Sequence, residues 1–112
     1  MAPILHHYAV GERGMSVERF VDTITCEPAR LFGIYPQKGT LQVGSDADIV
    51  IFDENIEVTI DYRNLHSESL YSVYEGYKVK GWPVTTISRG EVVCHEGEFF
   101  PGHVGKFVKA VF

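Results

Sequence analysis

The spacing of apolar residues changes from a helical to a strand-like period at Pro36, and this change limits the folds open to the chain. Before Pro36, apolar side chains recur three and four positions apart, at Val17, Phe20, Val21 and Ile24. After it, they recur at every second position, at Ile56, Val58 and Ile60. A length of 112 residues suits one domain. The pattern therefore predicts an α+β fold with helices first and a mainly β portion after them.

Two short helices are expected in the first third of the chain. Ser16 fits the N-cap of a helix over residues 17–25, because its side chain can accept a hydrogen bond from a free backbone N–H. A second helical segment opens at Glu27-Pro28, since proline is tolerated in a first turn, and ends at Gly33. Residues 1–15 are expected to be a loop or a helix end leading into the first helix.

Two strands are expected between residues 49 and 60. Residues 49–52 are a continuous apolar run between two aspartates, which is typical of a strand buried on both faces. Residues 56–60 place Glu57 and Thr59 between apolar positions. This alternation predicts a strand with one face in water.

Glycine-containing dipeptides mark the turns of the last third. Arg89-Gly90 separates the β-forming segments 84–88 and 91–95, which predicts a two-residue hairpin. Glu96-Gly97 forms another turn before Phe99 and Phe100. Hairpins join antiparallel strands, so the sheet is expected to be mainly antiparallel.

Residues 61–81 contain four tyrosines but no sustained period. A structureless loop of this length is uncommon inside a compact domain. We therefore expect a crossing segment that packs on a surface which this chain need not contain.

Charge and composition exclude several classes of partner. The net charge is −5 and no basic cluster is present, which argues against binding to nucleic acid or to an anionic membrane. No apolar run is long enough to span a membrane, and residues 1–8 lack the charged and apolar regions of a targeting segment. Cys26 and Cys94 lie far apart without a metal-binding spacing, so a cytoplasmic chain with two reduced thiols is expected.

Asp46 and Asp48 form the first candidate site, in the segment GTLQVGSDADIVIFD. Two carboxylates two positions apart point the same way in an extended chain and can share a proton or a metal ion. The competing interpretation is a tight turn over residues 44–47, in which Asp and Ser bind nearby backbone N–H groups and Gly44 has a positive φ. No His or Cys lies beside the pair, which favours the turn.

The remaining residues of catalytic type stand apart from one another. Adjacent His6 and His7 point to different sides in a helix or a strand, and His66, His95 and His103 are isolated, so no zinc-ligand spacing is present. No serine lies in a nucleophile elbow, neither cysteine has a nearby base, and no phosphate-binding loop occurs; the serines are Ser45, Ser67, Ser69, Ser72 and Ser88. The residues themselves therefore predict no catalytic, substrate-binding or metal site in this chain.

Several segments together resemble the C-terminal part of dihydropyrimidinases and D-hydantoinases, cyclic-amide hydrolases of the amidohydrolase superfamily. The segment GTLQVGSDADIVIFD is typical of the superfamily, and YEGYKVKGWPV narrows the resemblance to the hydantoinase, dihydropyrimidinase and collapsin-response-mediator group. The resemblance covers nearly the whole chain. Three departures from the family pattern are Cys26, Glu27 and Leu70.

The resemblance implies that the site lies outside this chain. In such enzymes a TIM-type barrel holds two divalent metal ions, expected to be zinc, through an HxH pair, a carboxylated lysine, two further histidines and an aspartate. None of these positions occurs in this sequence, so no cofactor is expected here. Residues 1–36 would close the parent barrel, and residues 37–112, with the crossing loop 61–81, would form half of a small β-sandwich.

The resemblance also implies the function and the partners of the parent protein. The parent would hydrolyse a cyclic ureide or amide, and the chain would contribute scaffold and contacts in a homo-oligomer. Its partners would be the missing barrel and the other half of the sandwich. The alternative is a non-catalytic assembly module related to the collapsin-response-mediator proteins.

Overall fold

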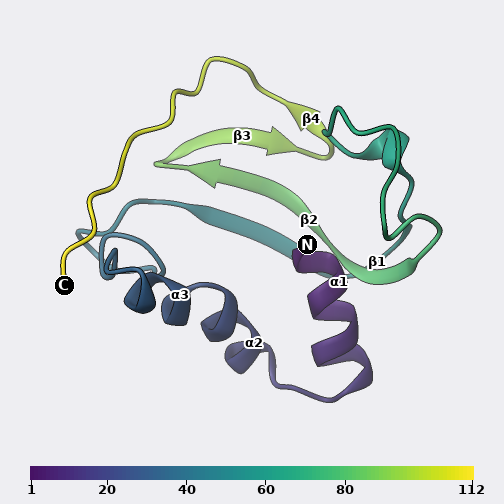
Figure 1. The fold of residues 1–112 in the computed structure, drawn as a ribbon, viewed down its shortest axis with the longest axis horizontal. Helices are drawn as coiled ribbons and strands as arrows, with labels where there is room; N and C mark the ends of the chain where they lie inside the picture. The colour runs from purple at the N-terminus through teal and green to yellow at the C-terminus, as the bar shows by residue number, and fades with distance from the viewer.

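The computed structural model describes all residues from 1 to 112, and it contains helices followed by one antiparallel sheet (Figure 1). The helices gather on one side of the sheet, and α1 packs against β2 (Figure 1). This arrangement confirms the expected mixture of helices and antiparallel strands. The elements are α1 (Ala2–His6), the π-helix η1 (His7–Glu12), α2 (Val17–Ile24), α3 (Cys26–Leu31), β1 (Ile49–Thr59), the 3₁₀ turn η2 (Tyr62–Asn64), β2 (Lys78–Ser88), β3 (Glu91–His95) and β4 (Glu98–Phe99).

The four strands form a meander in the order β1-β2-β3-β4. The turn between β2 and β3 has positive φ at Arg89 (46°) and Gly90 (84°), as a two-residue primed turn requires. Glu96 (47°) and Gly97 (81°) repeat this geometry between β3 and β4. Both predicted turns are confirmed.

The two predicted helices are also confirmed. Ser16 caps α2, because its Oγ accepts a hydrogen bond from the backbone N–H of Arg19 at 3.2 Å. Helix α3 begins at Cys26, and Gly33 follows it with a φ of 67°. The C-terminal tail returns to this end of α3, where the N–H of Val111 donates to the carbonyl of Gly33 at 2.7 Å (Figure 1).

The first 15 residues are more helical than the sequence suggested. Helix α1 continues directly into η1, so residues 2–12 are helical rather than a loop. Pro3 lies in the first turn, where it removes no helical hydrogen bond. Gly11 lies inside η1, and the helix ends before Gly14, which has a φ of 70°. Gly11 therefore does not break the helix, contrary to the expectation of a loop.

The two strands expected between residues 49 and 60 are one irregular strand, β1. Its pairing with β2 shifts between Asp53 and Glu57, where Asp53 Oδ1 accepts from the N–H of Asn55 at 2.8 Å. The prediction that residues 49–52 are buried on both faces is wrong, because Val50 and Ile51 are 56% and 52% exposed. The reason is that Val50 and Ile51 point to opposite faces of the sheet, and the helices of the chain pack mainly on β2 rather than on β1.

Residues 56–60 follow the expected alternation. Ile60 is buried, Ile56 and Val58 are half-buried, and Glu57 and Thr59 are exposed. The prediction of one wet face is confirmed.

The predicted loop of residues 61–81 is shorter than expected, because β2 begins at Lys78. The ends of the loop meet: the N–H of Ile60 donates to the carbonyl of Tyr77, and the N–H of Gly76 donates to the carbonyl of Ile60, both at 2.8 Å. Near this closure, hydrogen bonds from Arg63 lower the pKa of Asp61 to about 2. That the loop packs on a surface outside the chain stays a prediction.

The core of the chain is small. Its buried apolar side chains are Phe20, Ala29, Ile60 and Val79. The accessible surface is 8311 Å², whereas a compact monomer of 12.6 kDa exposes about 6,200 Å². The chain therefore exposes roughly a third more surface than a self-contained domain of its mass. None of its helices has the length and apolarity that a membrane-spanning segment needs.

Replacing Gly81 with alanine is expected to destabilise the chain more than the same change at Gly76. Both residues have positive φ, at 103° and 77°, so each change carries a backbone cost of about 1 kcal/mol. A Cβ at Gly81 would also lie 2.6 Å from His6 Nδ1 and 2.7 Å from the Phe52 ring, whereas nothing lies within 4 Å at Gly76. We expect Gly81→Ala to lose about 2 kcal/mol more in urea unfolding than Gly76→Ala. Equal losses would contradict the close packing of His6, Phe52 and Gly81.

Candidate functional site

Asp46 and Asp48 are held together by Lys38. The Lys38 ammonium lies 2.9 Å from Asp46 Oδ2 and also donates to Asp48 Oδ2. Gln37 Nε2 donates a further hydrogen bond to Asp46 Oδ2 at 3.1 Å. The two carboxylates thus share a cation supplied by the chain itself.

The same two aspartates connect the loop before β1 to the β2–β3 turn. Asp48 Oδ1 accepts from the backbone N–H of Arg89 at 2.8 Å, and the N–H of Gly90 donates to the carbonyl of Ala47 at 3.0 Å. A turn is present two residues earlier than predicted, because the N–H of Ser45 donates to the carbonyl of Gln42 at 3.1 Å, and Gly44 has the expected positive φ of 95°. The expected side-chain bonds to nearby backbone N–H groups are wrong, because Asp46 binds the side chains of Lys38 and Gln37, and Ser45 Oγ donates to the carbonyl of Pro36.

The electrostatics keep all three groups of this cluster charged. Burial alone would lower the pKa of Lys38, but its hydrogen bonds to Asp48 and Asp46 outweigh burial and raise it. The hydrogen bond from Lys38 is the main reason that the pKa of Asp46 is lowered. Burial raises the pKa of Asp48, yet the bonds from Lys38 and the Arg89 N–H lower it overall. Carboxylates held in the ionised form suit a structural ion cluster better than proton transfer near neutral pH.

His6 and His7 bind opposite polar atoms of one residue, Lys80. His6 Nδ1 lies 3.2 Å from the Lys80 carbonyl oxygen, and the Lys80 N–H donates to His7 Nδ1 at 3.1 Å. The second ring nitrogen of His6, Nε2, lies 2.9 Å from Glu54 Oε1. Both rings therefore reach the same residue, contrary to the expectation that they point to different sides, because η1 runs alongside β2.

The other three histidines lie in separate places. His95 pairs with Thr85 Oγ1 at 2.8 Å, His103 pairs with Glu91 at 3.1 Å, and the His66 ring lies 6.3 Å from that of Phe99. No group of three or more His, Cys, Asp or Glu side chains is placed to hold a metal ion, and both cysteines are unpaired. The donor set of residues 1–112 therefore does not fit a two-metal centre.

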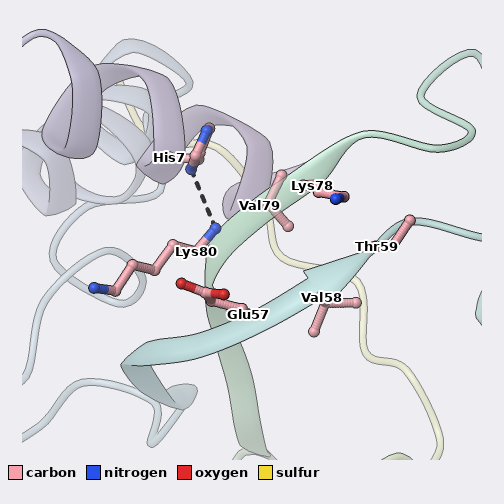
Figure 2. Close-up of a pocket in the computed structure, with 7 residues that line it drawn as sticks. All are labelled: His7, Glu57, Val58, Thr59, Lys78, Val79 and Lys80. Carbon is pink, nitrogen blue, oxygen red and sulfur yellow. Dashed lines mark hydrogen bonds between the residues drawn. The ribbon is translucent and has the colours of Figure 1, made fainter.

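A hollow of the chain lies between η1 and the β1–β2 ladder. Figure 2 shows His7 reaching to the backbone nitrogen of Lys80, with Glu57 on the neighbouring strand. Glu57 and Lys80 are cross-strand partners. The hollow has a volume of about 410 Å³ and is lined by His7, Glu57, Val58, Thr59, Lys78, Val79 and Lys80.

Lys38 and Lys80 are the residues that sequence reasoning missed. The partner of Lys38 lies 10 residues away, at Asp48, and Lys80 lies 73 residues from His7. A lysine just before the GSDAD segment is a weak local signal for the first pair. No sequence signal indicates the second, because it depends on how η1 packs on the sheet.

Comparison with known proteins now identifies the class of this chain. The model of the amidohydrolase family matches residues 1–93, so the chain belongs to that family. It is 44% identical over 104 residues to the D-hydantoinase of Ralstonia pickettii, covering 92% of this chain and 23% of that protein. It is 47% identical over 96 residues to the L-hydantoinase of Paenarthrobacter aurescens, covering 86% of this chain and 21% of that protein.

The fold is similar to solved structures of the same group. The dihydropyrimidinase from Brevibacillus agri matches with a TM-score of 0.84 at 40% identity, over 88% of this chain and 21% of that one. The resemblance to hydantoinases and dihydropyrimidinases is thereby confirmed. The chain spans about a fifth of the length of the relatives it matches.

Replacing Lys38 with methionine is expected to change how stability depends on pH. The lowered pKa values of Asp46 and Asp48 mean that their contribution to stability is complete above about pH 4 and is lost as pH falls through the folded-state values. Without Lys38 the carboxylates repel each other. Lys38→Met should therefore be less stable at pH 7 and lose less stability on acidification.

Urea unfolding at pH 7 and pH 3 measures this effect. Lys109→Met is the matched control, because Lys109 is exposed and makes no ion pair. The control should keep the acid dependence of the unsubstituted chain. If Lys38→Met also keeps it, the shared-cation description of Asp46 and Asp48 is wrong.

Proposed function

We propose that this chain is the C-terminal part of a hydantoinase or dihydropyrimidinase that hydrolyses a C–N bond of a cyclic ureide or amide. The observation that carries the proposal is the family match over residues 1–93, together with 44% identity to a D-hydantoinase. The chain corresponds to about a fifth of such a protein. Its role is scaffolding, and the catalytic residues lie outside it.

The exposed surface supports this role. Many large apolar side chains of the chain face solvent, and they come from the helices, the edge strand and the loop before β2. Apolar surface of this extent is typical of an interface rather than of a free monomer. We assign residues 1–36 to a helical segment that closes the parent barrel and residues 37–112 to half of a β-sandwich.

The metal ions expected in the parent would be held by residues outside this chain. The donor groups present do not converge, so no hydrolytic step is assigned to a residue of the chain. The polar clusters have structural tasks instead. Lys38 with Asp46 and Asp48 fixes the start of β1, and His6 with His7 fixes the N-terminal helix on β2.

A second candidate function is a non-catalytic assembly module, of the kind found in collapsin-response-mediator proteins. The same exposed apolar surface favours it, since such a surface also suits a homo-oligomer. Both candidates place the protein in the cytoplasm, in agreement with two unpaired cysteines. The two candidates differ in whether the completed protein opens a ring.

A chimeric enzyme tests the proposal. The matching segment of the Ralstonia pickettii D-hydantoinase is replaced with the aligned residues of this chain, which are 44% identical to it. We expect the chimera to open hydantoin at a rate within about tenfold of the parent enzyme, because similar scaffolds leave the barrel geometry unchanged. Product formation with zinc present is the measurement.

Two controls bracket the result. The same enzyme without the segment should be inactive, and the 112-residue chain alone with added zinc should not open hydantoin. A folded chimera without activity would favour the assembly module. Ring opening by the chain alone would overturn the assignment of a scaffolding role.

A further inference from the structure

Residues 100–112 form a tail without helix or strand that follows β4. The tail leaves the sheet at β4, runs past the β2–β3 turn and ends beside α3 (Figure 1). The family match covers residues 1–93, so the tail lies outside it. The contacts of the tail itself therefore indicate its role.

The first part of the tail runs antiparallel to β3 and reaches the β2–β3 turn. Its contacts fall at every second residue of the hairpin, from β3 back to the turn. They join the Phe100 N–H to the Val93 carbonyl at 2.9 Å, His103 Nδ1 to Glu91 Oε2 at 3.1 Å, and Arg89 Nη2 to the Val104 carbonyl. The tail is thus fixed to the sheet at three successive points.

The last part of the tail lies against the end of α3. The Val111 N–H donates to the Gly33 carbonyl at 2.7 Å. A Cβ at Gly33 would lie 2.9 Å from both the Val111 carbonyl oxygen and the Phe112 ring, closer than a real Cβ approaches such atoms. Only glycine therefore permits this approach, and glycine also suits the φ of 67° at this position.

Between these two attachments the tail passes over the ion cluster of Lys38. Residues 106–108 enclose a hollow of about 210 Å³ together with Gln37, Lys38, Asp46 and Arg89. Arg89 joins the tail to this cluster, since its side chain binds the tail and its backbone N–H binds Asp48. The tail therefore lies across the contact between the start of β1 and the β2–β3 turn.

The tail links two parts of the chain that α1 does not join. Helices α1 and η1 pack on β2 near Lys80 and Gly81, whereas α3 packs on α2. The tail reaches α3 from the turn at the other end of β2. Two separate attachments, one at each end of β2, thus hold the helices beside the sheet.

We propose that residues 100–112 form a detachable strap that ties the end of α3 to the β2–β3 hairpin. The strap is held mainly by hydrogen bonds, because Val104, Phe107 and Val111 are 74%, 92% and 76% exposed. The cost of ordering its backbone offsets much of what these bonds contribute, so the docked and released forms differ by a small free energy. The strap can therefore detach while the sheet stays folded. The inference does not depend on the hydrolytic function proposed above.

Val111→Pro tests the attachment at α3. Proline has no N–H, so this change removes the bond to Gly33 and keeps the rest of the strap. Trypsin cleaves after Lys106, which lies between the two attachments, and it acts on the released form of the strap. We expect cleavage at Lys106, measured by mass spectrometry, to become roughly two- to tenfold faster, the range that loss of one hydrogen bond gives.

Ala110→Pro is the matched control, because the Ala110 N–H donates no hydrogen bond to the chain. This variant should be cleaved at Lys106 at the rate of the unsubstituted chain. Both changes lie in the exposed tail, so the helices and the sheet fold as before. Equal cleavage rates for Val111→Pro and Ala110→Pro would overturn the strap.

Arg89→Met tests whether the two attachments act together. The change removes the bond to the Val104 carbonyl and keeps the backbone N–H that binds Asp48. Since the strap docks as one unit, hydrogen exchange of the Val111 N–H at its far end should also become roughly two- to tenfold faster. Arg13→Met, at an exposed arginine that follows η1, is the control and should leave this rate unchanged. An unchanged rate in Arg89→Met would show that the attachments are independent, which contradicts the proposal.

Protein concentration separates a strap from a contact between molecules. An intramolecular strap gives the Val111 N–H the same exchange rate at every protein concentration. Exchange that slows as the concentration rises would mean that the tail docks on a second copy of the chain. That result would overturn the proposal whatever the variants show.

Discussion

The pairing of β1 with β2 is the interaction on which the rest of the structure depends. It runs from Ile49 opposite Ile87 to Thr59 opposite Lys78. At one end, Asp48 ties the start of β1 to the turn after β2. At the other end, Ile60 and Tyr77 close the intervening loop. The histidines of the N-terminal helix bind the strand pair between these two ends. The register of β1 against β2 therefore determines where each polar cluster lies.

The sequence predicts the features that neighbouring residues determine. The cap at Ser16 and the primed turn at Arg89-Gly90 depend on side chains and φ angles within four residues, and both are present. The exposure of Val50 was not predictable, because an apolar run does not reveal whether another layer of the same chain covers its strand. The bonds of Lys80 to His6 and His7 join residues more than 70 positions apart, which local patterns cannot encode.

The GSDAD segment illustrates why a motif can identify a family without containing its chemistry. In the sequence its two carboxylates resemble a catalytic pair, yet in the structure they bind Lys38 and the N–H of Arg89. Ionised groups held by fixed donors stabilise one loop geometry and exchange protons poorly near neutral pH. The segment serves to set where β1 begins.

The loop between Ile60 and Tyr77 is closed at its base, so its length can vary without disturbing the sheet. Because the backbone bonds at its base hold the two ends together, the intervening segment can lengthen or shorten without moving β1 or β2. Doubling the length of such a loop costs only about 0.6 kcal/mol in closure entropy. Related chains can therefore diverge in size and surface at this position, and a foreign peptide grafted there would leave the sheet register intact.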